Sequence, residues 1–586
     1  MRSFFFLLVS LLIVLFSCKK KESFNKKVLN QICTAKVKGF DPIYASDRYS
    51  SLQVSKVYEG LYQYHYLKRP YVLEPNLAAD MPEVSEDGLT YIIELKKGVL
   101  FHDDECFEKG LGRELKAKDV VYSIKRLADP KLQSPCWWIL DNKLAGLDEW
   151  RAENTANDKV DYEAIIEGVK AIDPYTVKFV LKQPFPQFLY ALALSYTFIV
   201  PREAVDYYDQ DFINHPVGTG PFVTGAYQQS NKIVFNKNLK YREVFYPTKG
   251  EEGDEEKGLL KAAGKRLPLV DKVIVNIQTE SQPAWLSFEK GKIDHFGIPK
   301  DNFSQVMSDD KTINDEYLKK GISLQITPAL DVTYLAFNND DQLFKNNMKL
   351  RQAMSLAYNI EEVNSLFYNN RGIKAETMIP PGIAGYDPSY KNPFRIYDID
   401  KAKALLVEAG YPNGEGLPII EYETIASTES RQMAEYFVKS MEKIGVKIKV
   451  NTNTWPELVK KTDKKQAQMF GMAWGADYPD AENFLQLLYS GNVSPGSNSS
   501  NYSNPEFDKL FEKARQMQHS PERTALYSQL SQMAAEEIPW IFGIHRSTYA
   551  LSHSWLLNYK YSDLDHCAVK YYDIDLQKKK MIQPSL

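Results

Sequence analysis

The sequence is poor in cysteine and has no long hydrophobic run after its N-terminus. Five cysteines occur in 586 residues, and no two form a C-x-x-C pair, which argues against zinc-ribbon and thioredoxin-like sites. The eight histidines are scattered, without metal-ligand spacing on a helix. Charges nearly balance, at a formal net charge of -4, so we expect no nucleic-acid partner and no disordered acidic tail.

Catalytic motifs are also missing. The chain contains no G-x-S-x-G and no H-E-x-x-H, and His545 and His553 are close to serines in sequence only. The run His102-Asp103-Asp104-Glu105 looks like a metal cluster, but it follows a strand-like run and a turn, so a solvated loop is predicted. We predict that the protein is not an enzyme and has no cofactor.

The N-terminus carries the clearest signal in the chain. Arg2 precedes an apolar run, Phe4 to Phe16, which matches a signal peptide and is too short to span a membrane. The run ends Leu15-Phe16-Ser17-Cys18, and this ending resembles a bacterial lipobox, in which the thiol is alkylated by diacylglycerol. The alternative is a plain signal peptide or anchor that happens to contain a cysteine.

The lipobox predicts a signal peptide at 1–17 and a lipidated tether at 18–27. The tether begins with Cys18 and three lysines, and its polar residues are typical of a flexible linker. All later residues are then expected on the extracytoplasmic, periplasmic side. Lys20 fits release to the outer membrane under enterobacterial sorting, and the inner membrane stays open.

Short strand-like and helix-like runs alternate throughout the chain. Apolar spacing predicts helices over 119–127 and 400–409, the second capped by Asp400, and further helices from Asn504-Pro505 and Pro521. The strand-like runs are 91–95, 176–181, 232–236, 272–277 and 447–451. This mixture predicts an α/β (mixed α+β) fold.

Two segments are predicted to be loops. Tyr246 to Leu267 is rich in Gly, Lys and Glu and is typical of a solvated surface loop. Gly491 to Asn501 is rich in Gly, Ser and Asn, and it follows an aromatic segment, so it could border a cleft.

An ordered set of segments resembles the family 5 extracellular solute-binding proteins, the peptide- and nickel-binding components of ABC importers. The segments are Gly39-Phe40-Asp41-Pro42, Val57-Tyr58-Glu59-Gly60-Leu61, Glu74-Pro75-Asn76-Leu77-Ala78, Asp87-Gly88-Leu89-Thr90-Tyr91, Leu95 to Val99, Ala117 to Ser123, Val217 to Phe222, Phe337-Asn338-Asn339, Leu350 to Ala353, Ala409 to Pro412 and Trp474 to Phe484. Each segment alone is weak evidence for the family, but the ordered set is specific and covers nearly the whole mature chain. Extra residues, about 105–114, stand where the family has a tight turn.

The resemblance implies a periplasmic-binding-protein-like type II fold, with two large lobes, a hinge and an inserted domain. By the family pattern, lobe I takes 28–60, 215–326 and 537–586. The inserted domain II takes 61–214, and lobe III takes 327–536.

Within that division, four cysteines remain after Cys18. We favour pairing Cys106 with Cys136, and Cys33 with Cys567, because each pair then falls within one predicted lobe. Free buried thiols are the alternative.

The segment Trp474-Gly475-Ala476-Asp477-Tyr478-Pro479-Asp480 is the most informative part of the resemblance. In peptide-binding members, the aspartate three after the tryptophan pairs with the ligand α-ammonium, which implies Asp477 here. Trp474 is expected to offer an apolar wall, with Gly475 and Tyr478 also at the ligand. The alternative is that Asp477 caps a helix from about 481 or pairs with a lysine. Arg351 matches a family position on a helix, and the resemblance identifies no partner for a ligand carboxylate.

The predicted function is therefore a substrate-binding lipoprotein that captures peptides for an ABC importer. Its expected partners are a peptide, the permease and ATPase of the importer, and the membrane through Cys18, and a monomer is expected. The alternatives are a receptor of the same fold for a nickel chelate or oligosaccharide, and a surface lipoprotein without a transport role.

Overall fold

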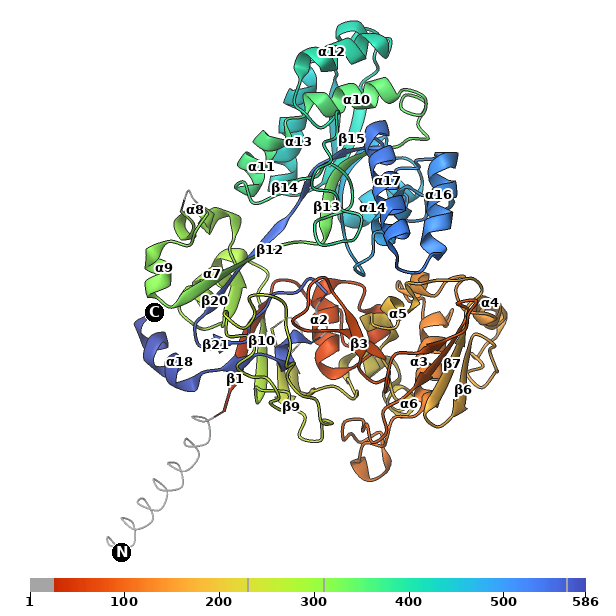
Figure 1. The fold of residues 1–586 in the computed structure, drawn as a ribbon, viewed down its shortest axis with the longest axis vertical. Helices are drawn as coiled ribbons and strands as arrows, with labels where there is room; N and C mark the ends of the chain where they lie inside the picture. Colours follow the sequence, from red (N-terminus) through yellow and green to blue (C-terminus); the bar gives the residue numbers. More distant parts are fainter. Residues whose placement is uncertain (1–25, 229–230, 309–310, 565–566) are drawn as a thin grey trace, which may run out of the picture.

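The computed structural model describes residues 26–228, 231–308, 311–564 and 567–586. Within these ranges the chain forms three parts, each built on its own β-sheet (Figure 1). We keep for them the names lobe I, inserted domain and lobe III. The predicted signal peptide and Cys18 lie outside the described residues. Among the described residues no helix is long and apolar enough to cross a membrane.

Lobe I is built on a sheet of order β1-β10-β9-β8. Its strands are β1 (Val28–Cys33), β10 (Lys272–Ile277), β9 (Lys232–Lys237) and β8 (Phe222–Gln228). β1 lies parallel to β10, far away in sequence, because alternating apolar residues such as Leu29 and Val273 face one core. A second sheet, β11-β20-β12, is formed by β11 (His295–Gly297), β20 (Ser547–His553) and β12 (Ile322–Pro328). The helices are α2 (Arg48–Val57), α7 (Ser281–Glu289), α8 (Phe303–Val306), α9 (Asp315–Lys319) and α18 (Leu576–Ile582).

The inserted domain is built on the sheet β4-β5-β7-β6. Its strands are β4 (Glu83–Val84), β5 (Thr90–Glu94), β7 (Thr176–Val180) and β6 (Val169–Asp173). α3 (Ala117–Ala128) packs on this sheet through Val120, Ile124 and Leu127, which share one helix face. The other helices are α4 (Leu147–Ala156), α5 (Phe188–Ala191) and α6 (Arg202–Tyr208).

Lobe III is built on the sheet β16-β15-β17-β13-β18. The strands are β16 (Ile448–Asn453), β15 (Ile420–Ile425), β17 (Met469–Gly475), β13 (Asp331–Phe337) and β18 (Trp540–Phe542). The helices are α10 (Met348–Ala357), α11 (Ile360–Tyr368), α12 (Ile399–Glu408), α13 (Thr428–Glu442), α14 (Trp455–Asp463), α15 (Glu482–Leu485), α16 (Pro505–Gln516) and α17 (Pro521–Glu537). Because β18 pairs with β13, we propose to extend lobe III to Phe542, past the predicted end at 536.

Short strand pairs complete the described fold. They are β2 (Tyr62–Tyr64) with β3 (Leu73–Pro75), β14 (Ile373–Lys374) with β19 (Ile544–His545), and β21 (Leu556–Leu557) with β22 (Asp573–Ile574). Two neighbouring strands, β12 and β20, run between lobe I and lobe III, and β12 leads directly into β13 (Figure 1). One apolar core runs through the β1 sheet and the inserted domain, whereas most of the lobe III core forms separate clusters.

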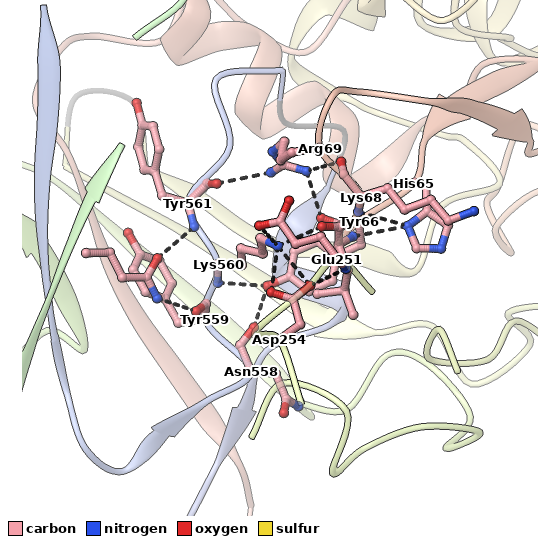
Figure 2. Close-up of polar contacts among 12 residues, drawn as sticks. His65, Tyr66, Lys68, Arg69, Glu251, Asp254, Asn558, Tyr559, Lys560 and Tyr561 are labelled. Carbon is pink, nitrogen blue, oxygen red and sulfur yellow. Dashed lines mark hydrogen bonds and ion pairs between the residues drawn. The ribbon is translucent and has the colours of Figure 1, made fainter. Parts of the chain in front are cut away.

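The acidic segment within 246–267, predicted to be solvated, is in fact anchored to the scaffold. Lys560 Nζ donates to Asp254 Oδ1 at 2.8 Å, to Glu251 Oε1 at 2.8 Å and to the carbonyl oxygen of Leu67 at 2.7 Å (Figure 2). Asp254 is completely buried. The prediction was wrong for these two acids because a cation from the C-terminal segment, distant in sequence, neutralises them.

Other local predictions were corrected by tertiary contacts. α12 is capped by Asp398 rather than Asp400, since the Asp398 carboxylate accepts from the backbone N–H of Lys401. His102 is buried rather than in a solvated loop, and its ring bonds to the carbonyl oxygen of Gly220 at 2.9 Å. Among the described residues, no three or more His, Cys, Asp or Glu side chains come together in a group that could hold a metal ion.

The preferred disulfide pairing was wrong. Cys33, Cys106, Cys136 and Cys567 are all free thiols in the described structure. Cys106 lies beside Asp104, whereas the thiol of Cys136 is buried, which raises its pKa to about 12. Membership of one predicted lobe therefore did not bring two cysteines together.

Candidate functional site

The predicted site segment leaves the lobe III sheet at the end of β17. Gly475 pairs with Asp331 of β13, and the chain then turns through Asp477 into α15. Asp477 does not cap that helix. The N-cap position is Ala481, and Asp480, one residue earlier, accepts from the backbone N–H of Glu482 at 2.9 Å.

Asn483 fixes the segment from within α15. Its Oδ1 accepts from the Trp474 ring N–H at 3.0 Å and from the backbone N–H of Asp477 at 3.1 Å. Its Nδ2 donates to Asp477 Oδ2 at 3.1 Å. The side-chain amide of Asn483 therefore fixes the positions of both the tryptophan ring and the aspartate carboxylate.

The two aspartates of the segment differ in their charge partners. Asp480 forms a buried salt bridge with Arg523 at 2.9 Å. Asp477 has no salt bridge among the described residues and receives only the Asn483 amide on its carboxylate. Burial, and less strongly the negative charge of Glu482, raises the pKa of Asp477 to about 6, and the Asn483 hydrogen bond opposes this. Asp477 is thus the carboxylate that lacks a cation.

Aromatic residues from outside lobe III face this segment. Tyr478 is buried and stacks on Tyr190 of the inserted domain, with ring centroids 5.8 Å apart. Its hydroxyl donates to Glu482 at 2.6 Å. Burial raises the pKa of Tyr64 and of Tyr196, and the charge of Asp477 adds to both shifts. Asp477 therefore lies at the junction between lobe III and the rest of the molecule.

A cavity of about 940 Å³ opens beside this junction. Trp474 and Tyr478 line it from lobe III, and Trp138 and Phe185 line it from the inserted domain. Gly491, Asn492, Pro495, Gly496 and Ser497 also line it, which confirms that the 491–501 loop borders a cleft. The volume suits a small solute.

The edge of β17 is only partly used by the sheet. β15 pairs with its first two residues, Met469 and Phe470, and the ladder then stops. Beyond that point β15 and β17 border a second cavity of about 420 Å³. Gly475 is exposed, and a side chain added there would meet no atom within 4 Å. The residues 471–475 thus offer backbone groups and open space on their β15 side.

Arg351 does not reach this site. It is buried, and its guanidinium donates to the carbonyl oxygens of Glu537 at 2.9 Å and Ile538 at 3.0 Å. Arg351 therefore supplies hydrogen-bond donors to the free backbone carbonyl groups at the C-terminal end of α17. Asn483, Tyr190 and Tyr64 were not predicted from the sequence. Asn483 lies within the family segment but has no motif of its own, and the two tyrosines come from distant parts of the chain.

The three-part fold with a lined cavity between its parts defines a binding protein. A model of the bacterial extracellular solute-binding proteins, family 5 middle region, matches residues 72–496. The chain belongs to this family of extracytoplasmic solute-binding proteins. Since its relatives are binding proteins, the prediction that it is not an enzyme is confirmed.

Curated relatives cover most of the chain. The dipeptide-binding protein of Escherichia coli strain K12 is 29% identical over 80% of this chain and 81% of its own length. Heme-binding protein A of Haemophilus influenzae is 28% identical over 92% of this chain and 93% of its own length. Among solved structures, the ABC transporter-associated periplasmic binding protein DppA from Helicobacter pylori, in complex with peptide STSA, has a TM-score of 0.72 at 26% identity and covers 94% and 98% of the two chains. These matches confirm the predicted family and fold class.

Proposed function

We propose that the protein captures peptides between lobe III and the rest of the molecule and presents them to an ABC importer. The ligand α-ammonium is held by Asp477, and Trp474, Gly475 and Tyr478 lie along the ligand. The observation that carries this proposal is a half-buried carboxylate without a cation partner among the described residues. A ligand ammonium supplies both the missing charge and hydrogen-bond donors.

The free edge of β17 supports an extended peptide as the ligand. A peptide that runs along 471–475 would exchange backbone hydrogen bonds with β17, and the cavity between β15 and β17 would receive a side chain. Backbone hydrogen bonds of this kind do not depend on the peptide sequence. They would contribute affinity for any peptide, whereas the cavity would select among side chains.

The hinge supports capture by closure. β12 and β20 cross side by side between lobe I and lobe III, and the lobe III core is largely separate. The inserted domain shares its core with the β1 sheet of lobe I, so we propose that the two move together. Closure of lobe III on them would cover the solute, and the closed form would dock on the permease.

The lipid on Cys18 completes the proposal. A tether of about ten residues after the lipid would keep the receptor near the membrane that holds the importer. Incorporation of labelled fatty acid into the full-length protein, and its loss in Cys18→Ser, tests this part.

Native mass spectrometry of the mildly purified protein tests the ligand class. Peptides bound to the protein and released on denaturation support the proposal. A bound heme, nickel chelate or oligosaccharide with no peptide would contradict it and would favour another receptor of the same fold. The heme-binding relative makes heme a necessary standard in that experiment.

A further inference from the structure

Lobe I carries a basic surface around α18, beside the point where the described chain begins. α18 contains three consecutive lysines, Lys578, Lys579 and Lys580, and Met581 follows them. Lys580 and Met581 are exposed, and Met581 keeps 73% of its surface open to solvent. Lysines with an exposed apolar side chain among them suit the boundary between water and a lipid surface.

Two turns from other parts of lobe I extend this surface at the C-terminal end of α18. Gln583 Nε2 donates to the carbonyl oxygen of Gly291 at 2.8 Å, so the turn at 290–292 lies against this end. A Cβ atom placed on Gly321 would lie 3.3 Å from the Ile582 side chain, so the turn after α9 lies there too. Both turns contribute exposed lysines. We call the combined set the α18 patch, and its members are Lys290, Lys292, Lys319, Lys578, Lys580 and Met581.

The α18 patch lies beside the start of β1, where the predicted tether enters the fold. Lys27 Nζ pairs at 2.6 Å with Asp573, three residues before α18. Lys579 of α18 pairs at 2.6 Å with Asp294, whose carboxylate also accepts from a backbone N–H of β1. Figure 1 shows α18 and the start of β1 together, at the end of lobe I away from lobe III. Ten extended residues span at most about 35 Å, so a lipid on Cys18 would hold the patch close to the membrane.

The acids near the patch are largely engaged within the fold. Asp575 accepts from two backbone N–H groups in the first turn of α18, at 3.1 and 2.9 Å. Glu316 pairs with Lys320 at 2.6 Å, and Glu289 accepts a tyrosine hydroxyl at 3.1 Å. Asp315, in the first turn of α9, is an exposed acid in this region. The positive charge of the patch is therefore only partly offset.

The lysines of the patch contrast with those near the end of α14 in lobe III. There Lys461 and Lys465 each pair with a carboxylate, at 2.7 and 3.1 Å. In the described part of the chain, Lys290, Lys292 and Lys319 form no salt bridge. Their charges are available to an external anion, although the formal net charge of the whole chain is -4.

We propose that the α18 patch docks on a membrane surface that contains anionic lipid. This inference rests on the proposed lipid tether and goes beyond it, since it assigns the receptor an orientation on the membrane. Each lysine near an anionic surface raises the bound fraction about fivefold, and the tether adds Lys19, Lys20 and Lys21. Because lobe III lies away from the patch, it stays free to close on the ligand (Figure 1).

Amine footprinting of the lipidated protein tests the docking. The protein isolated from cell envelopes is inserted into preformed vesicles, either of phosphatidylglycerol and phosphatidylethanolamine in equal parts or of phosphatidylcholine alone. A membrane-impermeant amine reagent then labels exposed lysines, and mass spectrometry measures each rate. Lys290, Lys292 and Lys319 should be labelled about 3- to 10-fold more slowly on the anionic vesicles. Lys460 and Lys464, exposed at α14, should be labelled equally on both. Salt at about 1 M should abolish the protection.

Matched charge variants show which lysines cause the protection. In Lys578→Gln/Lys580→Gln, the protection of the remaining patch lysines should fall to about twofold or less. Lys460→Gln/Lys464→Gln removes the same charge from lobe III and should keep the protection. Both variants should keep the wild-type melting temperature and the wild-type peptide affinity in the absence of vesicles, which shows that folding is not the cause.

The outcomes separate the docking from the tether. If the protein stays on both kinds of vesicle but its patch lysines are labelled equally on them, or Lys578→Gln/Lys580→Gln keeps the full protection, only the docking is overturned. If the protein does not stay on either kind of vesicle, the lipid tether in the proposed function and the docking both fail.

Discussion

The buried charges of the scaffold and the half-buried carboxylate of Asp477 in the cleft differ in their charge partners. Lys560 donates to two carboxylates and a carbonyl oxygen (Figure 2). Arg126 forms a buried, bidentate pair with Asp41 at 2.6 and 2.7 Å. In the cleft, Asp477 has one amide on its carboxylate and no cation among the described residues.

This difference supports the proposed position of the ligand. A buried charge costs several kcal/mol unless it is paired and hydrogen-bonded. In the scaffold the chain itself supplies the partners, so these charges hold distant segments together. In the cleft, we propose that the ligand supplies the missing cation, so that the ligand-free protein retains part of this free-energy cost.

The largest expected effect comes from breaking a scaffold cluster. Lys560→Met would leave Asp254 buried with no cation in contact, so we expect the free energy of unfolding to drop by about 3–5 kcal/mol. Denaturant unfolding measures this, with Lys439→Met as the matched change at an exposed lysine. A loss below about 1 kcal/mol would show that the cluster is not a structural anchor.

The opposite sign is expected in the cleft. The folded pKa of Asp477 is about 6, above the ordinary 3.8, so the ionised form is disfavoured in the folded state at neutral pH. Asp477→Asn removes that cost and should raise the stability of the ligand-free protein at pH 7 by about 1–3 kcal/mol. Thermal unfolding of the ligand-free proteins measures the change, and a destabilised variant would contradict the account.

The same pKa predicts how the stability difference varies with pH. Between about pH 4 and 6 the folded protein binds more protons at Asp477 than the unfolded chain does. Stability therefore falls as pH rises through this window and is flat above it, relative to Asp477→Asn. Below about pH 6 the affinity for a free-amine peptide should fall, by up to tenfold per pH unit, because the carboxyl is protonated. A pH series of calorimetric titrations, with an N-acetylated peptide as the control, checks the binding part.

The smallest effect is expected at Asn483. Asn483→Ala removes the amide that sets Trp474 and Asp477, so peptide affinity should weaken by about 1 kcal/mol, or roughly fivefold. Asn492→Ala provides a comparison, since this asparagine lines the cavity that Trp474 also lines and makes no hydrogen bond to Asp477. An equal loss of peptide affinity in both variants would contradict a positioning role for Asn483.

Much of the fold was accessible from the sequence. Local patterns gave β10 at 272–277 and the start of α16 at Pro505, because spacing and capping are local properties. The ordered family segments gave the fold class. The pairing of β18 with β13 could not be predicted from the sequence. The two strands lie about 200 residues apart, and no local pattern identifies one as the partner of the other.

The candidate site was predictable in part for the same reason. Asp477 could be proposed from the sequence because it lies in a segment that resembles the family. Its lack of a cation partner and the pairing of Asp480 with Arg523 depend on which distant segments come into contact. Which charged residues pair with one another in the folded protein cannot be predicted from local sequence patterns.

The central claim is that Asp477 holds the ligand ammonium. Calorimetry with a short peptide and its N-acetylated form, on the wild type and Asp477→Asn, tests it directly. We predict that acetylation weakens binding to the wild type by about 1.5–3 kcal/mol and has little effect on the variant. Equal affinity of both peptides for the wild type, or an unchanged preference in Asp477→Asn, would contradict the claim.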